Sequence, residues 1–398
     1  MDCESETGLI SNHKPVPGIT FLDKGRVSPV VFFNFGDTKM TTNTSAALEK
    51  AGNVNSLLQY AHSVPMAQVF KNIFLPPAQG SKRVQLPETI QVPVLNCNDK
   101  KYVPAVHDGY CFRKDLLRSV IAFLMNPHGD ALFLTGPTGS GKTSLITEIF
   151  GRLNWPLQQI TMTERFEFAD LRGSWIYSRT EGSDKPEMVF QPGPLLTAMR
   201  EGHGILLNEL DIAPAGELSG LNDIIEGRPL IVPETNEVIH PHPLFRMIVT
   251  GNSKGQGDDT GAYVGIQQQN IAAMDRYRTL EVGYPDKEVE EGILSNIFAP
   301  SLGPQMAEVF SKQFVDLANR VRAQFVGLNP LEGTLTVPMS TRCLTRWAYL
   351  MQDFCGCSNA VRAALNESLL NRCNESDRAA IEAMALAVFG KAWTNPID

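Results

Sequence analysis

A glycine-rich segment near the middle of the chain constrains the possible fold more than any other feature. Residues 136–143 read Gly-Pro-Thr-Gly-Ser-Gly-Lys-Thr and match every fixed position of the Walker A pattern. An apolar run at 131–134 precedes the segment, and a stretch of helical character at 143–153 follows it. Glycines let the backbone wrap a phosphate, and a helix N-terminus adds unpaired N–H groups and a positive dipole. The segment therefore predicts a strand, a phosphate-binding loop and a helix, in that order.

The residues of this loop are the candidate ligands of ATP, the nucleotide that we expect here. They are Gly136, Pro137, Thr138, Gly139, Ser140, Gly141, Lys142, Thr143 and Ser144. We expect the Lys142 ammonium to neutralise the β- and γ-phosphates and the Thr143 hydroxyl to bind Mg²⁺. ATP and Mg²⁺ are thus the two expected cofactors.

Short apolar runs alternate with helical stretches between about residues 101 and 299. Runs at 204–207 and 245–250 read as further buried strands, and residues 195–200 and 217–226 read as helices. This alternation predicts an α/β fold with a parallel sheet covered on both faces, a three-layer αβα core. From about residue 300 only helical patterns remain, at 306–322, 341–354 and 359–389. Residues 300–398 are therefore expected to form a small all-α lid domain.

The first hundred residues carry weaker patterns. Residues 1–39 mix proline, glycine and short apolar patches without lasting periodicity, so we expect a loosely ordered leader. Residues 40–100 are expected to hold a helix at 46–61, which a capping run precedes, and an extended arm. The prolines within 84–95 suit an edge strand or such an arm.

Acidic and amide side chains follow the apolar run at 204–207. Glu209 stands where P-loop ATPases keep the carboxylate that polarises the attacking water, and it is a candidate catalytic residue. The position before it, commonly an aspartate, is Asn208. An amide can bond a metal-bound water but adds no negative charge, so we expect Asn208 to contact the metal through water. Asp211 is either a second metal-side carboxylate or a substrate-side residue.

Three more polar positions have the order found in AAA+ proteins. Asn252 ends the apolar run at 245–250 and corresponds to sensor 1, which helps to orient water. Arg276 follows a glutamine-rich stretch that we read as a helix, where ring ATPases carry a finger for the neighbouring subunit; Arg278 is the runner-up. Arg342 opens a helix of the expected lid and corresponds to sensor 2. Asn252, Arg276 and Arg342 join Glu209 as candidate catalytic residues.

Several segments resemble the MoxR-type AAA+ ATPases and, within them, the ATPase subunit of aerobic cobaltochelatases. They read Arg-Leu-Asn-Trp-Pro at 152–156, His-Pro-His-Pro-Leu-Phe-Arg at 240–246, Gly-Gln-Gly-Asp-Asp-Thr-Gly-Ala-Tyr at 255–263, Gln-Gln at 267–268, Met-Asp-Arg at 274–276, Met-Ser-Thr-Arg at 339–342 and Leu-Asn-Arg-Cys at 370–373. The resemblance covers about residues 100–390. The chain departs from the family at Asn208, where the family has aspartate, and at Thr341, where it has proline.

The resemblance implies a homo-oligomeric ring, a hexamer, that stacks on a partner with a von Willebrand A-type domain. ATP turnover in such rings acts on a larger client. In cobaltochelatase the client is the subunit that inserts Co²⁺ into a corrin ring. The family therefore implies a motor that remodels a partner complex.

Composition narrows the setting. The net charge of -8 argues against a dedicated nucleic-acid binder. Seven scattered cysteines suit a reducing compartment, and Cys355 and Cys357 lack a second pair at zinc spacing. No apolar run reaches the roughly 18 residues of a membrane helix, and the acidic N-terminus is unlike a signal peptide. We therefore expect a cytoplasmic protein that does not contact membranes.

Two alternatives to an ATP-hydrolysing motor stay open on the sequence alone. The first is a nucleotide-gated scaffold that hydrolyses ATP weakly, because Asn208 brings no charge to the metal. The second is an AAA+ motor directed at nucleic acid, which the acidic composition disfavours. A steady-state ATPase assay, with and without nucleic acid, separates the three functions.

Overall fold

The computed structural model describes residues 60–76, 79–178, 186–257, 265–326, 328 and 331–395. These residues belong to one compact unit that spans residues 42–398. The leader expected at 1–39 and nearly all of the helix expected at 46–61 lie outside the described residues.

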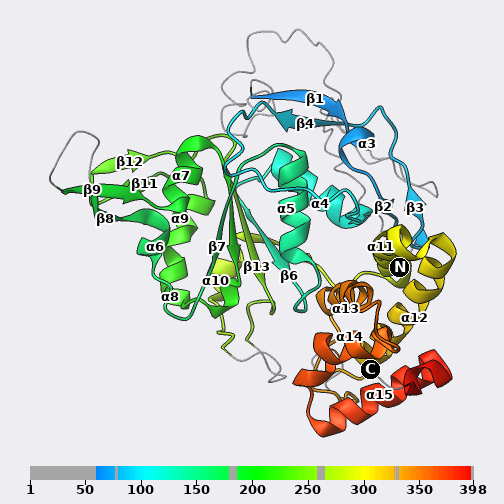
Figure 1. The fold of residues 1–398 in the computed structure, drawn as a ribbon. Coiled ribbons are helices and arrows are strands. Elements are labelled where there is room, and N and C mark those ends of the chain that lie inside the picture. The colour runs from blue at the N-terminus through cyan, green and yellow to red at the C-terminus, as the bar shows by residue number, and fades with distance from the viewer. Residues whose placement is uncertain are drawn as a thin grey trace, which may run out of the picture. The chain divides into compact units, whose positions relative to one another are not determined.

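The centre of the chain forms a five-stranded parallel sheet, as the alternating pattern predicts (Figure 1). The strands lie in the order β14 (Tyr277–Glu281), β6 (Ala131–Thr135), β13 (Arg246–Gly251), β10 (Gly204–Asn208) and β7 (Leu157–Thr161). The three strands expected from apolar runs are β6, β10 and β13. Because β13 lies between β6 and β10, the loops that follow these three strands meet at one edge of the sheet.

Helices cover both faces of this sheet, which gives the expected three layers (Figure 1). Helices α4 (Lys114–Met125) and α5 (Lys142–Arg152) lie on one face, and α7 (Pro194–Glu201) lies on the other. Alternate residues of each strand point to opposite faces, so Phe133 and Ile205 join the apolar cluster that contains Leu195 of α7.

Short elements surround the second face. The single helix expected at 217–226 occurs as three short consecutive elements. Gly220, in the middle one, packs so closely against Phe168 that a Cβ there would be 2.9 Å from the ring. The elements of this region are α6 (Phe168–Arg172), the hairpin β8 (Gly173–Ser178) and β9 (Glu187–Pro192), η2 (Leu210–Ile212), α8 (Ala215–Leu218), η3 (Ser219–Leu221), α9 (Asn222–Ile225), and the hairpin β11 (Leu230–Val232) and β12 (Glu237–Ile239).

The described part of the N-terminal region is mainly extended. Strands β1 (Ala61–Pro65) and β4 (Gln91–Leu95) pair antiparallel, with Pro93 in β4. A second small sheet consists of β2 (Ile73–Phe74), β3 (Arg83–Val84) and β5 (Phe112–Arg113), and the short helix α3 (Met66–Val69) lies between β1 and β2.

The C-terminal region is helical and has an apolar core of its own. Its helices are α11 (Lys287–Leu302), α12 (Pro304–Ala323), α13 (Thr341–Asp353), α14 (Ala360–Ser368) and α15 (Glu375–Phe389), with the short turns η4 (Leu370–Arg372) and η5 (Gly390–Thr394). Phe314 and Trp347 stack at its centre, with ring centroids 3.6 Å apart. Leu294 and Phe298 of α11 belong to the same core, and α11 runs through residue 300. We therefore propose that the lid starts at the beginning of α11.

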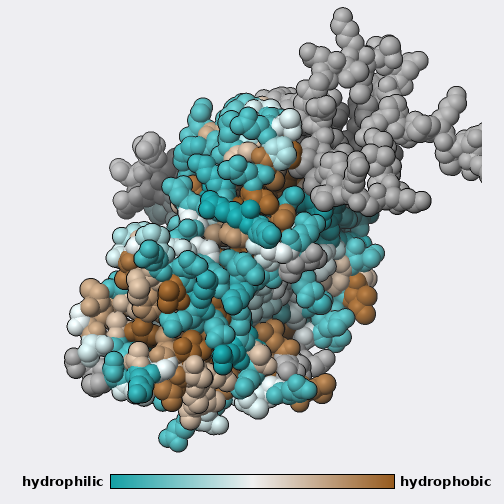
Figure 2. Space-filling model, turned by 90° about the vertical axis from the view of Figure 1, so that its right-hand side faces the viewer, coloured by the Kyte–Doolittle hydropathy of each residue, from teal (hydrophilic) through white to brown (hydrophobic). Residues whose placement is uncertain are grey.

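The surface of the helical region mixes polar and apolar side chains. Its exposed large apolar residues include Met306, Val309, Tyr349 and Leu386. Figure 2 shows brown, apolar surface scattered among teal, hydrophilic surface on the side that it presents. Among the described residues no helix is both long and apolar enough to cross a membrane.

Candidate nucleotide-binding site

The loop between β6 and α5 has the backbone of a phosphate cradle. Helix α5 starts at Lys142 behind Gly141, which has a φ of 93° and gives the helix no side-chain cap. The first N–H groups of α5 are therefore open to an anion, which the helix dipole favours. At Gly136 a Cβ would stand 2.2 Å from the carbonyl oxygen of Val282, so the close approach of the chain requires glycine there.

Lys142 lies at the centre of the site. Only 8% of its surface is exposed, and its Nζ donates to the carbonyl of Gly136 at 2.7 Å and to Oδ1 of Asn252 at 2.9 Å. Burial lowers the pKa of Lys142 to about 8, against the opposing pull of the Asp211 and Glu209 carboxylates. An anion beside Nζ would offset this cost of burial, so Lys142 fits a phosphate.

Thr143 and Asn208, both expected near the metal, are in direct contact. The Thr143 hydroxyl donates to Oδ1 of Asn208 at 2.7 Å, and the Thr250 hydroxyl donates to the same oxygen at 3.2 Å. These hydroxyl and amide oxygens are hard ligands of the kind that Mg²⁺ prefers. Mg²⁺ therefore fits the donor atoms of this corner.

Glu209 follows β10 in an unusual conformation. Its φ of 59° is in the left-handed region, which few residues other than glycine adopt, and its side chain is exposed. The Glu209 backbone N–H donates to the Thr250 hydroxyl at 3.3 Å. Backbone outliers of this kind often occur at functional sites, where the surrounding structure holds them.

Asp211 supports the turn that carries Asn252. It is 1% exposed, and its Oδ2 accepts the backbone N–H groups of Asn252 at 2.6 Å and Ser253 at 2.9 Å. Its other oxygen, Oδ1, is buried and has no hydrogen-bond partner among the described residues, so the metal-side role of Asp211 stays a prediction. Through Oδ2, Asp211 fixes the start of the segment after β13.

The helical region brings Arg342 to the loop. Arg342 is the second residue of α13, and a Cβ at Gly139 would stand 3.5 Å from the Arg342 Cβ. Ser340 caps α13 by accepting the backbone N–H of Cys343, as a helix start at 341 requires. Arg342 also contributes to the lowered pKa of Lys142, after the larger effect of burial. Arg342 thus lies near the phosphate-binding loop.

Arg276 and Arg278 lie at the start of β14, the edge strand next to β6. Arg276 is 33% exposed, and its Nε bonds Glu226 at 2.7 Å. Arg278 contacts Asp130 at 3.4 Å and the carbonyls of Asn126 and Pro127. Both arginines are therefore held by groups of their own chain.

The stretch before Arg276 corrects one expectation. Between residues 265 and 276, all of which the structure describes, Ile271–Met274 is the helical segment (α10), and the glutamines at 267–269 are not helical. Their polar groups bond the turn after Glu209 instead: the Gln267 N–H donates to the Asp211 carbonyl at 2.7 Å, and Gln269 Nε2 donates to the Ala213 carbonyl at 3.3 Å. These tertiary hydrogen bonds replace those of a helix.

Two residues at the site were not expected from the sequence. Thr250 joins Asn208 to the Glu209 backbone, and its place at the end of a buried strand was the only signal. The Tyr284 hydroxyl donates to the Thr138 carbonyl of the loop at 3.0 Å. No motif or spacing marks Tyr284, because this contact joins residues 146 positions apart.

Comparison with known families agrees with this geometry. The model of the AAA domain (dynein-related subfamily) matches residues 131–262, which include β6, β10 and β13. The model of the CbbQ/NirQ/NorQ C-terminal region matches residues 303–388, within the helical region. The first model thus spans four of the five strands of the parallel sheet, and the second spans the helices from α12 into α15.

Individual relatives point the same way. The aerobic cobaltochelatase subunit CobS of Sinorhizobium sp is 30% identical over 306 residues, which cover 76% of this chain and 87% of CobS. Midasin of Dictyostelium discoideum is 28% identical over 258 residues, 64% of this chain but 4% of midasin. Midasin of Giardia intestinalis is 31% identical over 179 residues, again 4% of its length. The chain therefore belongs to the MoxR-type AAA+ ATPases and is a homologue of CobS.

Proposed function

We propose that this protein is an ATP-hydrolysing motor that works as a ring and remodels a partner complex. One observation carries the proposal: Lys142 of the phosphate-binding loop bonds Asn252, the residue directly after β13, and β13 lies between β6 and β10. This contact joins a phosphate-binding group to a water-orienting group. The membership of the chain in the AAA+ ATPases supports the same activity.

The loop residues Gly136 to Ser144 would hold the phosphates of ATP. Ser140 supports this assignment, because its buried Oγ has no hydrogen-bond partner among the described residues. The Thr143 hydroxyl would bind Mg²⁺, and Asn208 would contact it through water. Bound Mg²⁺ would neutralise phosphate charge, as in other P-loop enzymes.

Hydrolysis would depend on four side chains. The Glu209 carboxylate would accept a proton from the attacking water, and Asn252, held by Asp211, would orient that water. Arg342 would stabilise the charge on the γ-phosphate from the same chain. Arg276 would do so from the neighbouring subunit, which requires release from Glu226.

The partner is proposed from the relatives. CobS is named as a subunit of aerobic cobaltochelatase, and this chain covers most of its length. We propose that this protein works as a hexameric ring with a von Willebrand A-domain protein and a larger client. Metal insertion into a corrin ring is the client reaction that CobS suggests.

The decisive experiment is a steady-state ATPase assay on the purified oligomer. We expect turnover that depends on Mg²⁺, is lost in Glu209→Gln and is indifferent to added DNA or RNA. Glu281→Gln is the matched control, because Glu281 is an exposed carboxylate that pairs with Lys254. Absence of turnover at saturating ATP in an assembled ring would refute the motor and leave a nucleotide-gated scaffold.

A further inference from the structure

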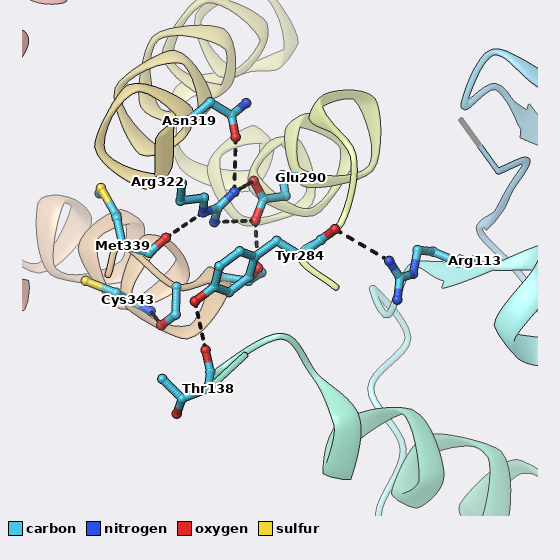
Figure 3. A network of polar contacts seen from close by, with 10 residues as sticks. Arg113, Thr138, Tyr284, Glu290, Asn319, Arg322, Met339 and Cys343 are labelled. Atoms are coloured by element: carbon cyan, nitrogen blue, oxygen red, sulfur yellow. Dashed lines mark hydrogen bonds and ion pairs between the residues drawn. The ribbon is translucent and has the colours of Figure 1, made fainter. Parts of the chain in front are cut away.

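A short strap of chain passes directly over the phosphate-binding loop. It runs from Val282 to Asp286, between β14 and α11. The Val282 N–H donates to the Thr135 carbonyl at 2.7 Å, and the Val282 carbonyl lies against Gly136. Two residues further, the Tyr284 hydroxyl donates to the Thr138 carbonyl at 3.0 Å (Figure 3). The strap therefore holds the first half of the loop at two points.

The Tyr284 ring is held in turn by an arginine of α12. The Arg322 guanidinium lies over the ring, 4.4 Å from its centroid. Its Nη1 and Nη2 bond the two carboxylate oxygens of Glu290 at 2.7 and 2.8 Å, and its Nε donates to the Met339 carbonyl at 2.7 Å. Glu290 is fully buried and Arg322 nearly so. A bidentate pair away from water has one favoured geometry, so the guanidinium is a rigid support for the ring.

The same carboxylate also reaches the helix that carries Arg342. The Thr341 hydroxyl donates to Oε1 of Glu290 at 2.7 Å. Ser340, just before it, lies against the loop, because a Cβ at Gly139 would be 2.6 Å from the Ser340 Cβ. The buried ion pair is thus connected to the loop by Tyr284 and to the start of α13 by Thr341. Figure 3 shows the contacts that lead from Thr138 through Tyr284 to Arg322 and Glu290.

We propose that Tyr284 is a positioning residue for ATP hydrolysis, which fixes the phosphate-binding loop relative to Arg342 through the buried Arg322–Glu290 pair. The inference rests on the proposed ATPase function. Tyr284 acts through its hydroxyl on the loop and through its ring on Arg322. It does not touch the reacting atoms.

The network predicts which kinetic constant depends on Tyr284. The N–H groups that would face the phosphates are those at the uncapped start of α5, and Lys142 is fixed by its own contacts. These groups persist without the Tyr284 hydroxyl, so ground-state binding of ATP changes little. Arg342 is the second residue of α13, so its place relative to the loop depends on how the helical region is held. Loss of the hydroxyl therefore lowers kcat rather than raising KM.

The test uses Tyr284→Phe, which removes the hydroxyl and keeps the ring over Arg322. We expect kcat per nucleotide site to fall about 3- to 10-fold, the range for one lost hydrogen bond, with KM for ATP within about 2-fold of wild type. ADP affinity, measured by calorimetry, also stays within about 2-fold. Tyr349→Phe is the matched control, since Tyr349 is a 56% exposed tyrosine on α13, away from the strap.

A second variant tests the route through Arg322. Arg322→Lys keeps the charge but loses the planar fork that pairs with Glu290 and stacks on the ring. We expect it to lower kcat as well, and the double variant Tyr284→Phe with Arg322→Lys to lose less than the product of the two single losses. Such a coupling is expected where two residues act through one contact.

The outcomes separate this inference from the proposed function. If wild type hydrolyses ATP and Tyr284→Phe lowers only the melting temperature, with kcat per site and KM unchanged, Tyr284 is structural and the inference is wrong. A rise in KM at constant kcat also overturns it, as does a fully multiplicative double variant. If wild type fails to hydrolyse ATP, the proposed function is wrong, and the inference that rests on it is wrong too.

Discussion

At the scale of single residues, several polar groups around Lys142 support one another through hydrogen bonds. Asp211 holds the backbone at Asn252, Asn252 accepts from Lys142, and Thr250 accepts from the backbone of Glu209. Such mutual support holds side chains in the geometry that the reaction needs, and positioned polar groups supply much of the lowering of an enzyme's activation barrier. Substitutions in this cluster should therefore change binding or turnover in distinguishable ways.

Replacing Lys142 tests the phosphate-binding loop. We expect Lys142→Ala to weaken ATP binding by about 100-fold or more, since charge-assisted hydrogen bonds to phosphate contribute a few kcal/mol. Isothermal titration with ATP measures the change. Lys254→Ala is the control, because Lys254 is 60% exposed and pairs with Glu281 at the surface. Wild-type affinity in Lys142→Ala would contradict the assignment of the loop.

Replacing Asn208 tests the missing charge near the metal. Its Oδ1 accepts from Thr143 and Thr250, and a carboxylate at this position can accept from both hydroxyls. We expect Asn208→Asp to raise turnover or to lower the Mg²⁺ concentration at half-maximal turnover, because the added charge attracts the cation. Titration of ATPase activity with Mg²⁺ measures both. If both worsen, the amide is the better partner for this site.

At the scale of elements, the loop depends on helices that follow it by more than a hundred residues. Helix α11 supplies Glu290, α12 supplies Arg322, and α13 begins at Thr341, which bonds the same carboxylate. The helices of the lid are thus fastened to one another by a buried ion pair beside the loop. This pair has a testable effect on stability.

Breaking the pair should destabilise the lid strongly. We expect Glu290→Ala to lower the free energy of unfolding by about 3–5 kcal/mol, since it leaves a buried guanidinium without its partner. Urea denaturation followed by tryptophan fluorescence measures this loss. The matched control is Glu308→Ala, which removes an exposed partner of Lys312 on α12 and should change nothing measurable. Equal stabilities of the two variants would show that water reaches the buried pair.

At the scale of the whole molecule, we propose that a neighbouring subunit completes the candidate site. Arg276 is bound to Glu226 of its own chain, and it lies on the segment that precedes β14 rather than beside Lys142. A ring would bring the Arg276 of one subunit to the loop of the next. This arrangement can be tested by mixing inactive subunits.

The mixing experiment combines Lys142→Ala with Arg276→Ala. The first variant binds no ATP but offers its arginine, and the second binds ATP but offers none. We expect each alone to lose activity, by about 10³-fold or more for Arg276→Ala, and the mixture to recover part of it at interfaces with both groups intact. Native mass spectrometry checks that subunits exchange. If exchanged mixtures stay inactive at every ratio, Arg276 is not a finger, and Arg278 is tested in its place.

The sequence by itself determined the nucleotide-binding core. A Walker A segment needs a strand before it and a helix after it, so β6 and α5 could be located within a residue or two. The strands β10 and β13 could be predicted for a different reason, because a buried parallel strand is a short, continuous apolar segment. The order of motifs along the chain also marked Asn252 as a candidate, and the structure puts it next to the loop, because β13 lies between β6 and β10.

Only the tertiary structure decided how these parts are held together. Asp211 was readable as an acid, but its use by the backbone of Asn252 and Ser253 depends on a turn formed 41 residues later. The local sequence at 267–269 suits a helix, yet Gln267 and Gln269 donate to the Asp211 and Ala213 carbonyls instead of forming helical hydrogen bonds. Tyr284 carries no motif, and its contacts with Thr138 and Arg322 join three separate segments. Spacing along the chain encodes the hydrogen bonds of a helix and the residues that share one face of a helix or strand, whereas contacts between distant segments are set by packing of the whole core and lid.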